Sequence, residues 1–152
     1  MPGDLVMKAL NRVHRLVLGA TGGRFGWEAW GMPVVELTTT GRRTGLSRTT
    51  LLTSPYQEGS TVVVVASRGG DAHHPAWYLN VRDHPAVTAR VGGGPRRSMR
   101  AVVADEGERA RLWPVLTDLH PNYAGYQRRT DREIPVVLLV PDEGDGTGVG
   151  SG

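Results

Sequence analysis

The chain has 152 residues and a mass of 16.4 kDa, which suits one domain with a single core. It contains no cysteine, so disulfides, thiolate nucleophiles, iron–sulfur clusters and cysteine zinc sites are excluded, and redox chemistry would require a bound cofactor. The net charge of +3 and the pI of about 9.8 come mainly from arginine, whose planar guanidinium suits phosphate and carboxylate oxygens, so an anionic ligand is favoured.

Apolar residues at three- and four-residue steps predict an amphipathic helix over Leu5–Val17, ended by a glycine-rich stretch. Such a helix either caps the rest of the domain or lies on an anionic membrane surface. The chain has no apolar run of about 18 residues and no signal-peptide pattern. We therefore expect a cytoplasmic protein, with peripheral contact at the inner face of the cell membrane through Leu5–Val17 as an alternative.

After Pro33 the sequence changes to short β-rich runs bounded by turn residues. Four consecutive valines within one of these runs predict a buried strand. The predicted pattern of five or six antiparallel strands with short helices between them indicates an α+β fold built on a small β-barrel, rather than a parallel doubly wound sheet. The predicted strands are Val34–Thr39, Arg48–Thr53, Ser60–Ser67, Ala86–Val91, Ser98–Ala104 and Pro135–Val140.

Short helices are predicted between the strands. Pro75 suits a first helical turn and begins a helix over Ala76–Arg82. Asp105, with a glutamate three residues later, resembles a capping box that opens a helix to about Asp118, and a further helix is expected from Pro121. The chain is thus divided into an N-terminal helix and linker (1–32), a barrel domain (33–141) and a glycine-rich tail expected to be disordered (142–152).

The predicted hairpin tip Gly41–Gly45 carries Arg42 and Arg43, and Arg48 follows within the return strand. Three guanidinium groups and exposed turn amides in one short stretch form a suitable clamp for an anion. The alternative is a solvated turn whose arginines only keep the protein soluble. Arg48 favours the clamp, because a strand position would otherwise hold threonine or valine.

A second group begins at the end of the valine strand with Ser67–Gly70 and leads to Pro75–Asn80. Its small residues allow a ligand to approach the backbone, and amides at the start of the Pro75 helix favour negative charge. A planar cofactor could therefore lie against Trp77. The alternative is that Trp77 belongs to the core, because tryptophan buries a large apolar area.

Several other chemistries lack support in the sequence. Adjacent side chains in the pair His73-His74 point apart and have no third ligand nearby, so no metal site is predicted. No nucleophile elbow and no dinucleotide-binding fingerprint is present. Tyr123 and Tyr126 would share one helix face, where a phenol could donate a proton to a substrate oxygen or simply pack.

Three motifs together resemble the deazaflavin-dependent nitroreductase family, whose members have a split β-barrel and use coenzyme F-420. They are Leu37–Gly45, Ala66–Gly70 and His74–Asn80, and the resemblance extends from about Pro33 to Pro141. One departure is Leu79, where family members tend to have a polar residue, often histidine. This departure concerns contacts at the edge of the cofactor ring and leaves the fold unaffected.

The resemblance implies a role for each motif. The hairpin would hold the phosphate and glutamate tail of the cofactor, and the glycine turn with the tryptophan segment would line the deazaflavin ring. Catalytic roles on the acceptor side would fall to Tyr123, Tyr126 and Ser67. The cofactor-binding residues implied in this way are Arg42, Arg43, Arg48, Thr49, Ser67, Arg68, Gly69, Ala76, Trp77 and Asn80.

The resemblance further implies an oxidoreductase that transfers hydride from reduced coenzyme F-420 to a small organic acceptor such as a quinone, nitro or enone compound. Few catalytic side chains are then required, because the cofactor carries the hydride chemistry. The alternatives are an FMN-binding oxidoreductase of the same barrel class, a non-catalytic cofactor carrier and a nucleic-acid-binding barrel. Nucleic acid is not expected as a partner, because the strands lack the interleaved surface aromatics that stack bases.

Overall fold

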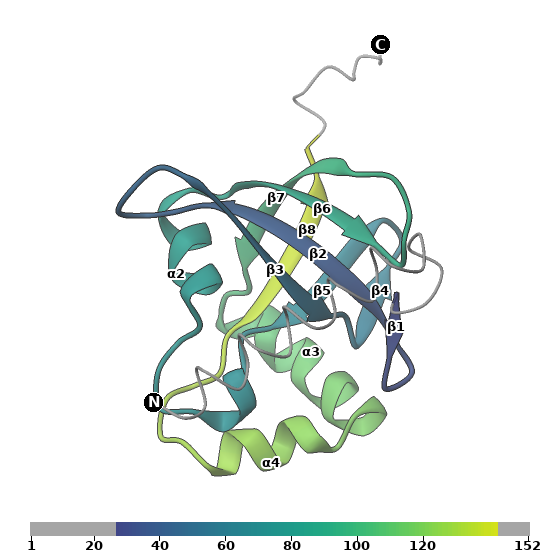
Figure 1. Cartoon of the computed structure of the whole chain (residues 1–152). Helices are drawn as coiled ribbons and strands as arrows, with labels where there is room; N and C mark the ends of the chain where they lie inside the picture. The colour runs from purple at the N-terminus through teal and green to yellow at the C-terminus, as the bar shows by residue number, and fades with distance from the viewer. Residues whose placement is uncertain (1–26, 143–152) are drawn as a thin grey trace.

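The computed structural model describes residues 27–142, so the helix predicted at Leu5–Val17 and the predicted tail beyond residue 142 lie outside the described residues. The tertiary structure is dominated by antiparallel strands (Figure 1). In chain order the elements are β1 (Glu28–Ala29), β2 (Met32–Thr40), β3 (Ser47–Thr53), β4 (Tyr56–Glu58), β5 (Thr61–Val65), η1 (Arg68–Gly70), α2 (Ala76–Asp83), β6 (Ala86–Val91), β7 (Arg97–Val103), α3 (Glu106–Leu119), α4 (Asn122–Arg128) and β8 (Val136–Pro141).

The strands form one eight-stranded sheet in the order β1-β2-β6-β7-β8-β5-β4, with β3 paired with β2 outside this path. Every pairing is antiparallel. The sheet curls, and within residues 27–142 no strand pairing connects β3 to β4 or β5, so the barrel is incompletely closed (Figure 1). The predicted α+β barrel of antiparallel strands with short helices is therefore confirmed.

All six strands expected from the sequence are present, with ends that differ by a few residues. Three short elements escaped prediction, namely β1, β4 and η1. Each has only two or three residues, which is too short to display a hydrophobic period. As a result the sheet begins at Glu28, earlier than the barrel boundary expected at Pro33.

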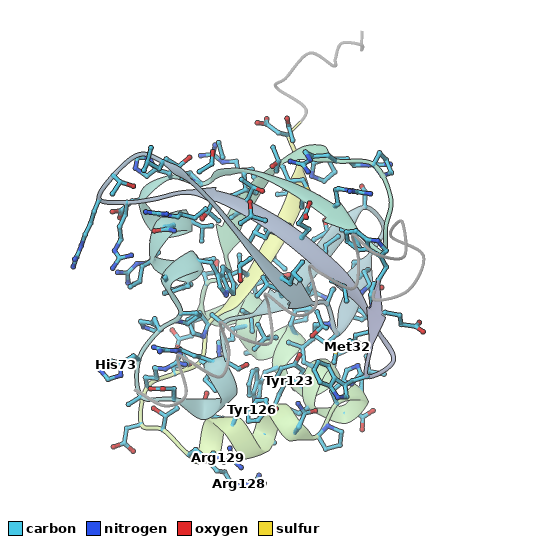
Figure 2. The ribbon with its side chains drawn as sticks, viewed as in Figure 1. Met32, His73, Tyr123, Tyr126, Arg128 and Arg129 are labelled. Atoms are coloured by element: carbon cyan, nitrogen blue, oxygen red, sulfur yellow. The ribbon has the colours of Figure 1, made fainter. Side chains whose placement is uncertain are left out.

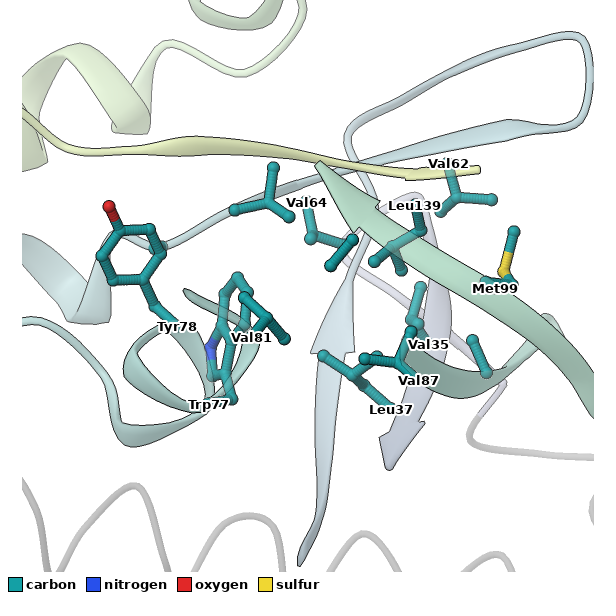
Figure 3. Packing of buried hydrophobic residues seen from close by; sticks show 14 residues of the cluster. Val35, Leu37, Val62, Val64, Trp77, Tyr78, Val81, Val87, Met99 and Leu139 are labelled. Carbon is teal, nitrogen blue, oxygen red and sulfur yellow. The ribbon is translucent and has the colours of Figure 1, made fainter. Parts of the chain in front are cut away.

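The four valines of β5 pack on both faces of the sheet. Val62 and Val64 belong to an inner cluster that α2 covers with Trp77 and other side chains (Figure 3). Val63 and Val65 point the opposite way, into a second cluster beneath α3 and α4. Because neighbouring side chains of a strand alternate between faces, a strand buried on both faces must be apolar throughout. This confirms the buried strand predicted from the valine run.

The helices begin where their residues indicated. The Asp105 carboxylate accepts a hydrogen bond from the backbone N–H of Glu108 at 2.8 Å, so Asp105 is the N-cap of α3, as expected. Further along α3, Arg111 donates two hydrogen bonds of 2.9 Å to the carboxylate of Glu58 and thereby fastens the short edge strand β4. None of the helices between residues 27 and 142 is long and apolar enough to cross a membrane.

Candidate functional site

The cationic hairpin is formed by β2 and β3, whose last pair is Thr40 with Ser47. Its turn is closed by a hydrogen bond of 2.8 Å from the Gly45 N–H to the Gly41 carbonyl, and Gly45 has a φ of +73°, which glycine adopts without strain. This geometry places Arg42 and Arg43 at the tip. Arg43 is exposed and Arg42 is half-buried, so the tip presents positive charge to solvent.

Asn80 of α2 fixes the position of this hairpin. Its side chain is only 5% exposed. The Oδ1 atom accepts hydrogen bonds from the backbone N–H of Arg42 at 3.1 Å and from the Arg42 guanidinium at 3.4 Å, while Nδ2 donates to the Thr39 hydroxyl at 3.1 Å. The polar atoms of Asn80 are thus engaged within the protein, which makes Asn80 a strut between α2 and the hairpin. Its predicted contact with a cofactor stays a prediction.

The register of the hairpin separates two residues that the sequence had grouped. Arg48 pairs with Thr39 and therefore lies on the same sheet face as Asn80. Thr49 pairs with Thr38, and the two hydroxyl oxygens lie 2.9 Å apart on the opposite face. Arg48 can therefore act together with the tip arginines on the α2 side, whereas Thr49 points away from that side.

The glycine turn adopts an unusual backbone conformation. Arg68, Gly69 and Gly70 have φ values of +47°, +64° and +83°, so three successive residues lie in the left-handed region. A Cβ atom at Gly70 would lie 2.7 Å from the carbonyl oxygen of Tyr126, so this glycine allows the turn to pack against α4. At Gly69, which is exposed, a Cβ would have no atom within 4 Å. The Gly69 carbonyl accepts a hydrogen bond of 3.3 Å from Arg129, whereas the Cα side of Gly69 is open to a flat ligand.

Arg132 holds this turn, although nothing in the sequence singled it out. Its Nε donates to the Asp71 carbonyl at 2.8 Å and its Nη2 to the Ser67 carbonyl at 2.8 Å. Its Nη1 reaches the Ala66 carbonyl and the Nδ1 atom of His74, each at 3.2 Å. Partial burial lowers the pKa of Arg132. One guanidinium thus gathers three backbone carbonyls and a histidine.

The two predicted tyrosines lie together but in different environments. Their rings are 5.9 Å apart in an edge-to-face arrangement, on the side of α4 that faces the sheet, while Arg128 points away from it (Figure 2). Arg129 donates to the Gly69 carbonyl at 3.3 Å and lies over the Tyr126 ring. Tyr123 is 5% exposed, and its hydroxyl donates to the Met32 sulfur at 3.8 Å. Burial raises the pKa of Tyr123 to about 12. Tyr126 is half-buried and is the more accessible phenol.

Trp77 is 7% exposed and belongs to the inner core cluster, where it meets Tyr78 edge to face (Figure 3). This burial agrees with the alternative that Trp77 is a core residue. The neighbouring Ala76 is exposed, and Leu79 packs against the same cluster. Contact of Trp77 with a cofactor ring stays a prediction, since only a small part of the indole is accessible.

The helix α2 separates the hairpin from the glycine turn. Its N-terminal end follows the turn, where the rings of His74 and Tyr78 lie 4.7 Å apart, while Asn80, the fifth of its eight residues, binds the hairpin. From Ala76 to Asn80 the helix rises by about 6 Å. The predicted residues therefore form two groups on opposite sides of α2, a cationic one at the hairpin and one with exposed backbone at the turn (Figure 1).

An incompletely closed antiparallel barrel of this kind is the split-barrel fold of F420-dependent reductases. More specifically, the model of the F420H(2)-dependent quinone reductase family matches residues 10–141, and the chain belongs to this family. Family membership confirms the predicted dependence on coenzyme F-420 and the predicted oxidoreductase class.

Individual relatives agree. An F420H(2)-dependent quinone reductase of Mycobacterium tuberculosis is 39% identical over 136 residues, which cover 86% of this chain and 89% of that protein. The solved structure of an F420-H2 dependent reductase, FDR-A, superposes with a TM-score of 0.62 at 37% identity and covers 70% of this chain and 93% of its own. A structure described as a domain-swapped dimer has a TM-score of 0.61 at 33% identity, with coverage of 91% and 99%.

Proposed function

We propose that this chain transfers hydride from reduced coenzyme F-420 to a quinone-type acceptor, with the anionic tail of the cofactor on the β2–β3 hairpin and its ring at the Ser67–Gly70 turn. The observation that carries this proposal is that the two groups lie on opposite sides of α2 (Figure 1). A ligand with a flat ring at one end and a polyanion at the other suits this arrangement. FMN has a shorter anionic arm and would need fewer positive groups.

The hairpin arginines and the exposed backbone of the turn fit such a cofactor. Arg42, Arg43 and Arg48 supply planar guanidinium groups on or beside an exposed tip, and these bind phosphate and carboxylate oxygens in pairs. On the other side of α2, the exposed Gly69 leaves room for a ring against the backbone. Because the tip is in contact with solvent, its attraction for the tail should depend on salt.

When bound, the deazaflavin supplies the hydride chemistry. The contribution of the chain is then to hold and orient. The hairpin fixes the tail, the turn fixes the ring plane, and the walls of the site hold the acceptor at a short distance from the ring. We infer that Tyr126, the more accessible phenol, orients the acceptor and delivers a proton to its oxygen, since the Tyr123 phenol is engaged with Met32 inside the core.

The test of cofactor choice is a fluorescence titration of the purified chain with coenzyme F-420, FMN and a single-stranded oligonucleotide. We expect the tightest binding for coenzyme F-420. Replacing Arg42 and Arg43 together by alanine should weaken it by at least about tenfold and flatten its salt dependence, because charged hydrogen bonds are lost. A double alanine variant of Arg97 and Arg100, which are exposed on β7, removes the same charge and should bind normally. FMN binding as tight as that of coenzyme F-420 would sink the proposal.

The acceptor side is tested at Tyr126. Tyr126→Phe should slow acceptor reduction by about a hundredfold if the phenol delivers a proton, with little change in cofactor affinity. Tyr123→Phe is the matched control, because it removes a phenol from the same helix face but one that is buried. It should alter stability more than rate. Unchanged turnover of Tyr126→Phe with several quinones would return Tyr126 to a packing role.

The small-molecule acceptor follows from the family, while the physiological quinone is a matter for substrate screening. Peripheral membrane contact through Leu5–Val17 also stays a prediction, because those residues lie outside the described part of the chain. We predict this membrane contact because quinones dissolve in bilayers. Co-sedimentation of the full chain with anionic vesicles at low salt would support this contact. If the chain does not bind the vesicles, the predicted membrane contact is wrong.

A further inference from the structure

The proposed function makes no use of Arg132, although it forms the densest set of polar contacts beside the glycine turn. We propose that Arg132 is a positioning residue, which holds the Ser67–Asp71 turn in the shape that receives the cofactor ring, and that it does so only while His74 is neutral. The inference rests on the proposed function in one respect, namely that the ring lies on this turn.

The Ser67–Asp71 turn has an uncommon backbone conformation. A non-glycine residue with positive φ is uncommon, and Arg68 has a φ of +47° immediately before two left-handed glycines. Such conformations persist only where the surroundings fix them. Arg132 does this by binding the carbonyls of Ser67 and Asp71, which flank the left-handed residues on either side. Arg129 adds one hydrogen bond of 3.3 Å to the Gly69 carbonyl, but without Arg132 the carbonyls on either side of the left-handed residues lose their shared partner.

The backbone of Arg132 is itself fixed to α4. The Gln127 side chain donates to the Arg132 carbonyl at 2.8 Å and accepts from the Ile134 N–H at 2.9 Å. Arg109 of α3 donates to the same Gln127 oxygen at 3.1 Å and to the Ile134 carbonyl at 2.9 Å. Arg132 therefore links the Ser67–Asp71 turn to α4, which also carries Tyr126. The residues proposed for the ring side and the acceptor side of the site are thus held in a fixed relative position.

His74 lies against the guanidinium of Arg132. A guanidinium has no acceptor atom, so the 3.2 Å contact between its Nη1 and the His74 Nδ1 requires an unprotonated Nδ1, and hence a neutral ring with its hydrogen on Nε2. Protonation would place a second cation against Arg132. The titratable and charged groups around His74 are Arg132 from the α4–β8 connection, Arg82 and Tyr78 from α2, and Asp71, His73 and Arg68 from its own connection.

The direction of the pH effect follows from these neighbours. Burial first, then the charges of Arg132 and Arg82, lower the pKa of His74 below its ordinary value. The unfolded chain therefore binds more protons than the folded chain in the interval between the two pKa values. The stabilisation from neutral His74 is complete above the pKa that this histidine has in the unfolded chain. It is lost as pH falls through the lower pKa that His74 has in the folded chain. Order in the turn should follow the same course.

The experiment uses hydrogen exchange by NMR on the full chain without cofactor. The reporters are the amides of Gly70 and Asp71, which donate to the Ser67 and Arg68 carbonyls at 2.9 and 3.1 Å. In Arg132→Gln their exchange should accelerate by at least about tenfold while the amides of β5 stay protected. Arg132→Lys should rescue little, because one ammonium cannot span three carbonyls. Arg128→Gln is the control, since that side chain is exposed and points away from the sheet.

Two further measurements complete the test. Affinity for coenzyme F-420 should fall by about tenfold in Arg132→Gln without a change in its salt dependence, because a preordered site is lost. Exchange is expressed as protection factors, the intrinsic rate at each pH divided by the observed rate, and His74→Gln should abolish the loss of protection that lowering pH causes in the parent chain. If the amides of Gly70 and Asp71 remain protected in both Arg132 variants, Arg132 does not hold the turn and the proposal is wrong. A loosened turn with unchanged affinity would overturn the positioning role, whereas a parent chain that does not bind the cofactor overturns the proposed function instead.

Discussion

Replacing Gly70 by alanine is expected to lower the free energy of unfolding by about 2–5 kcal/mol and to weaken binding of coenzyme F-420. About 1–2 kcal/mol comes from forcing an L side chain into a left-handed backbone with φ of +83°. A further 1–3 kcal/mol or so comes from overpacking, because the new Cβ would lie 2.7 Å from the Tyr126 carbonyl oxygen, a backbone atom that cannot move aside on its own. Urea denaturation and a cofactor titration measure the two effects.

Gly69→Ala is the matched control for the stability measurement. Its φ of +64° carries a comparable backbone strain, but a Cβ there has no atom within 4 Å, so the loss should be only about 1–2 kcal/mol. The difference between the two variants isolates the contact between the turn and α4. Equal destabilisation of the two variants would mean that this contact does not constrain the turn.

Replacing Asn80 by alanine is expected to cost about 1–3 kcal/mol and to loosen the cationic hairpin. The variant leaves the Arg42 N–H and the Thr39 hydroxyl without their partner in a site that is 5% exposed. Since the hairpin would then sample several orientations relative to α2, the affinity for coenzyme F-420 should fall as well. The measurements are urea denaturation, hydrogen exchange of the hairpin amides and a cofactor titration.

Arg42→Ala separates the two roles of this contact. It removes the guanidinium and its 3.4 Å bond but retains the backbone N–H bond of 3.1 Å to Asn80. We therefore expect this variant to lose cofactor affinity with little change in stability or hairpin exchange. If Asn80→Ala is as stable as the parent and its hairpin amides remain protected, the strut role is wrong and direct contact of Asn80 with the cofactor becomes the better explanation.

The local sequence pattern determined most of the strands, the start of α3 and the arginines of the hairpin tip. The strands were predicted from β-rich runs between turn residues, and the burial of β5 on both faces from its four valines, because side-chain alternation follows from strand geometry. Asp105 marked the start of α3 for a similarly local reason, since an N-cap acts within its own first turn. The arginines of the hairpin tip were also evident, because the residues of a tight turn are neighbours in sequence. The motifs then sufficed to indicate the family, which the comparisons confirmed.

Tertiary structure alone decided how the site is held together. Arg132 lies 65 residues from Ser67, and Asn80 lies 38 residues from Arg42, so neither contact leaves a periodic or local trace in the sequence. The same applies to Gly70, whose reason for being glycine is the backbone of α4, and to Thr49, which the hairpin register turns away from Arg48. Such roles depend on which segments fold against one another, and a charged or small residue carries no mark of its partner until the chain has packed.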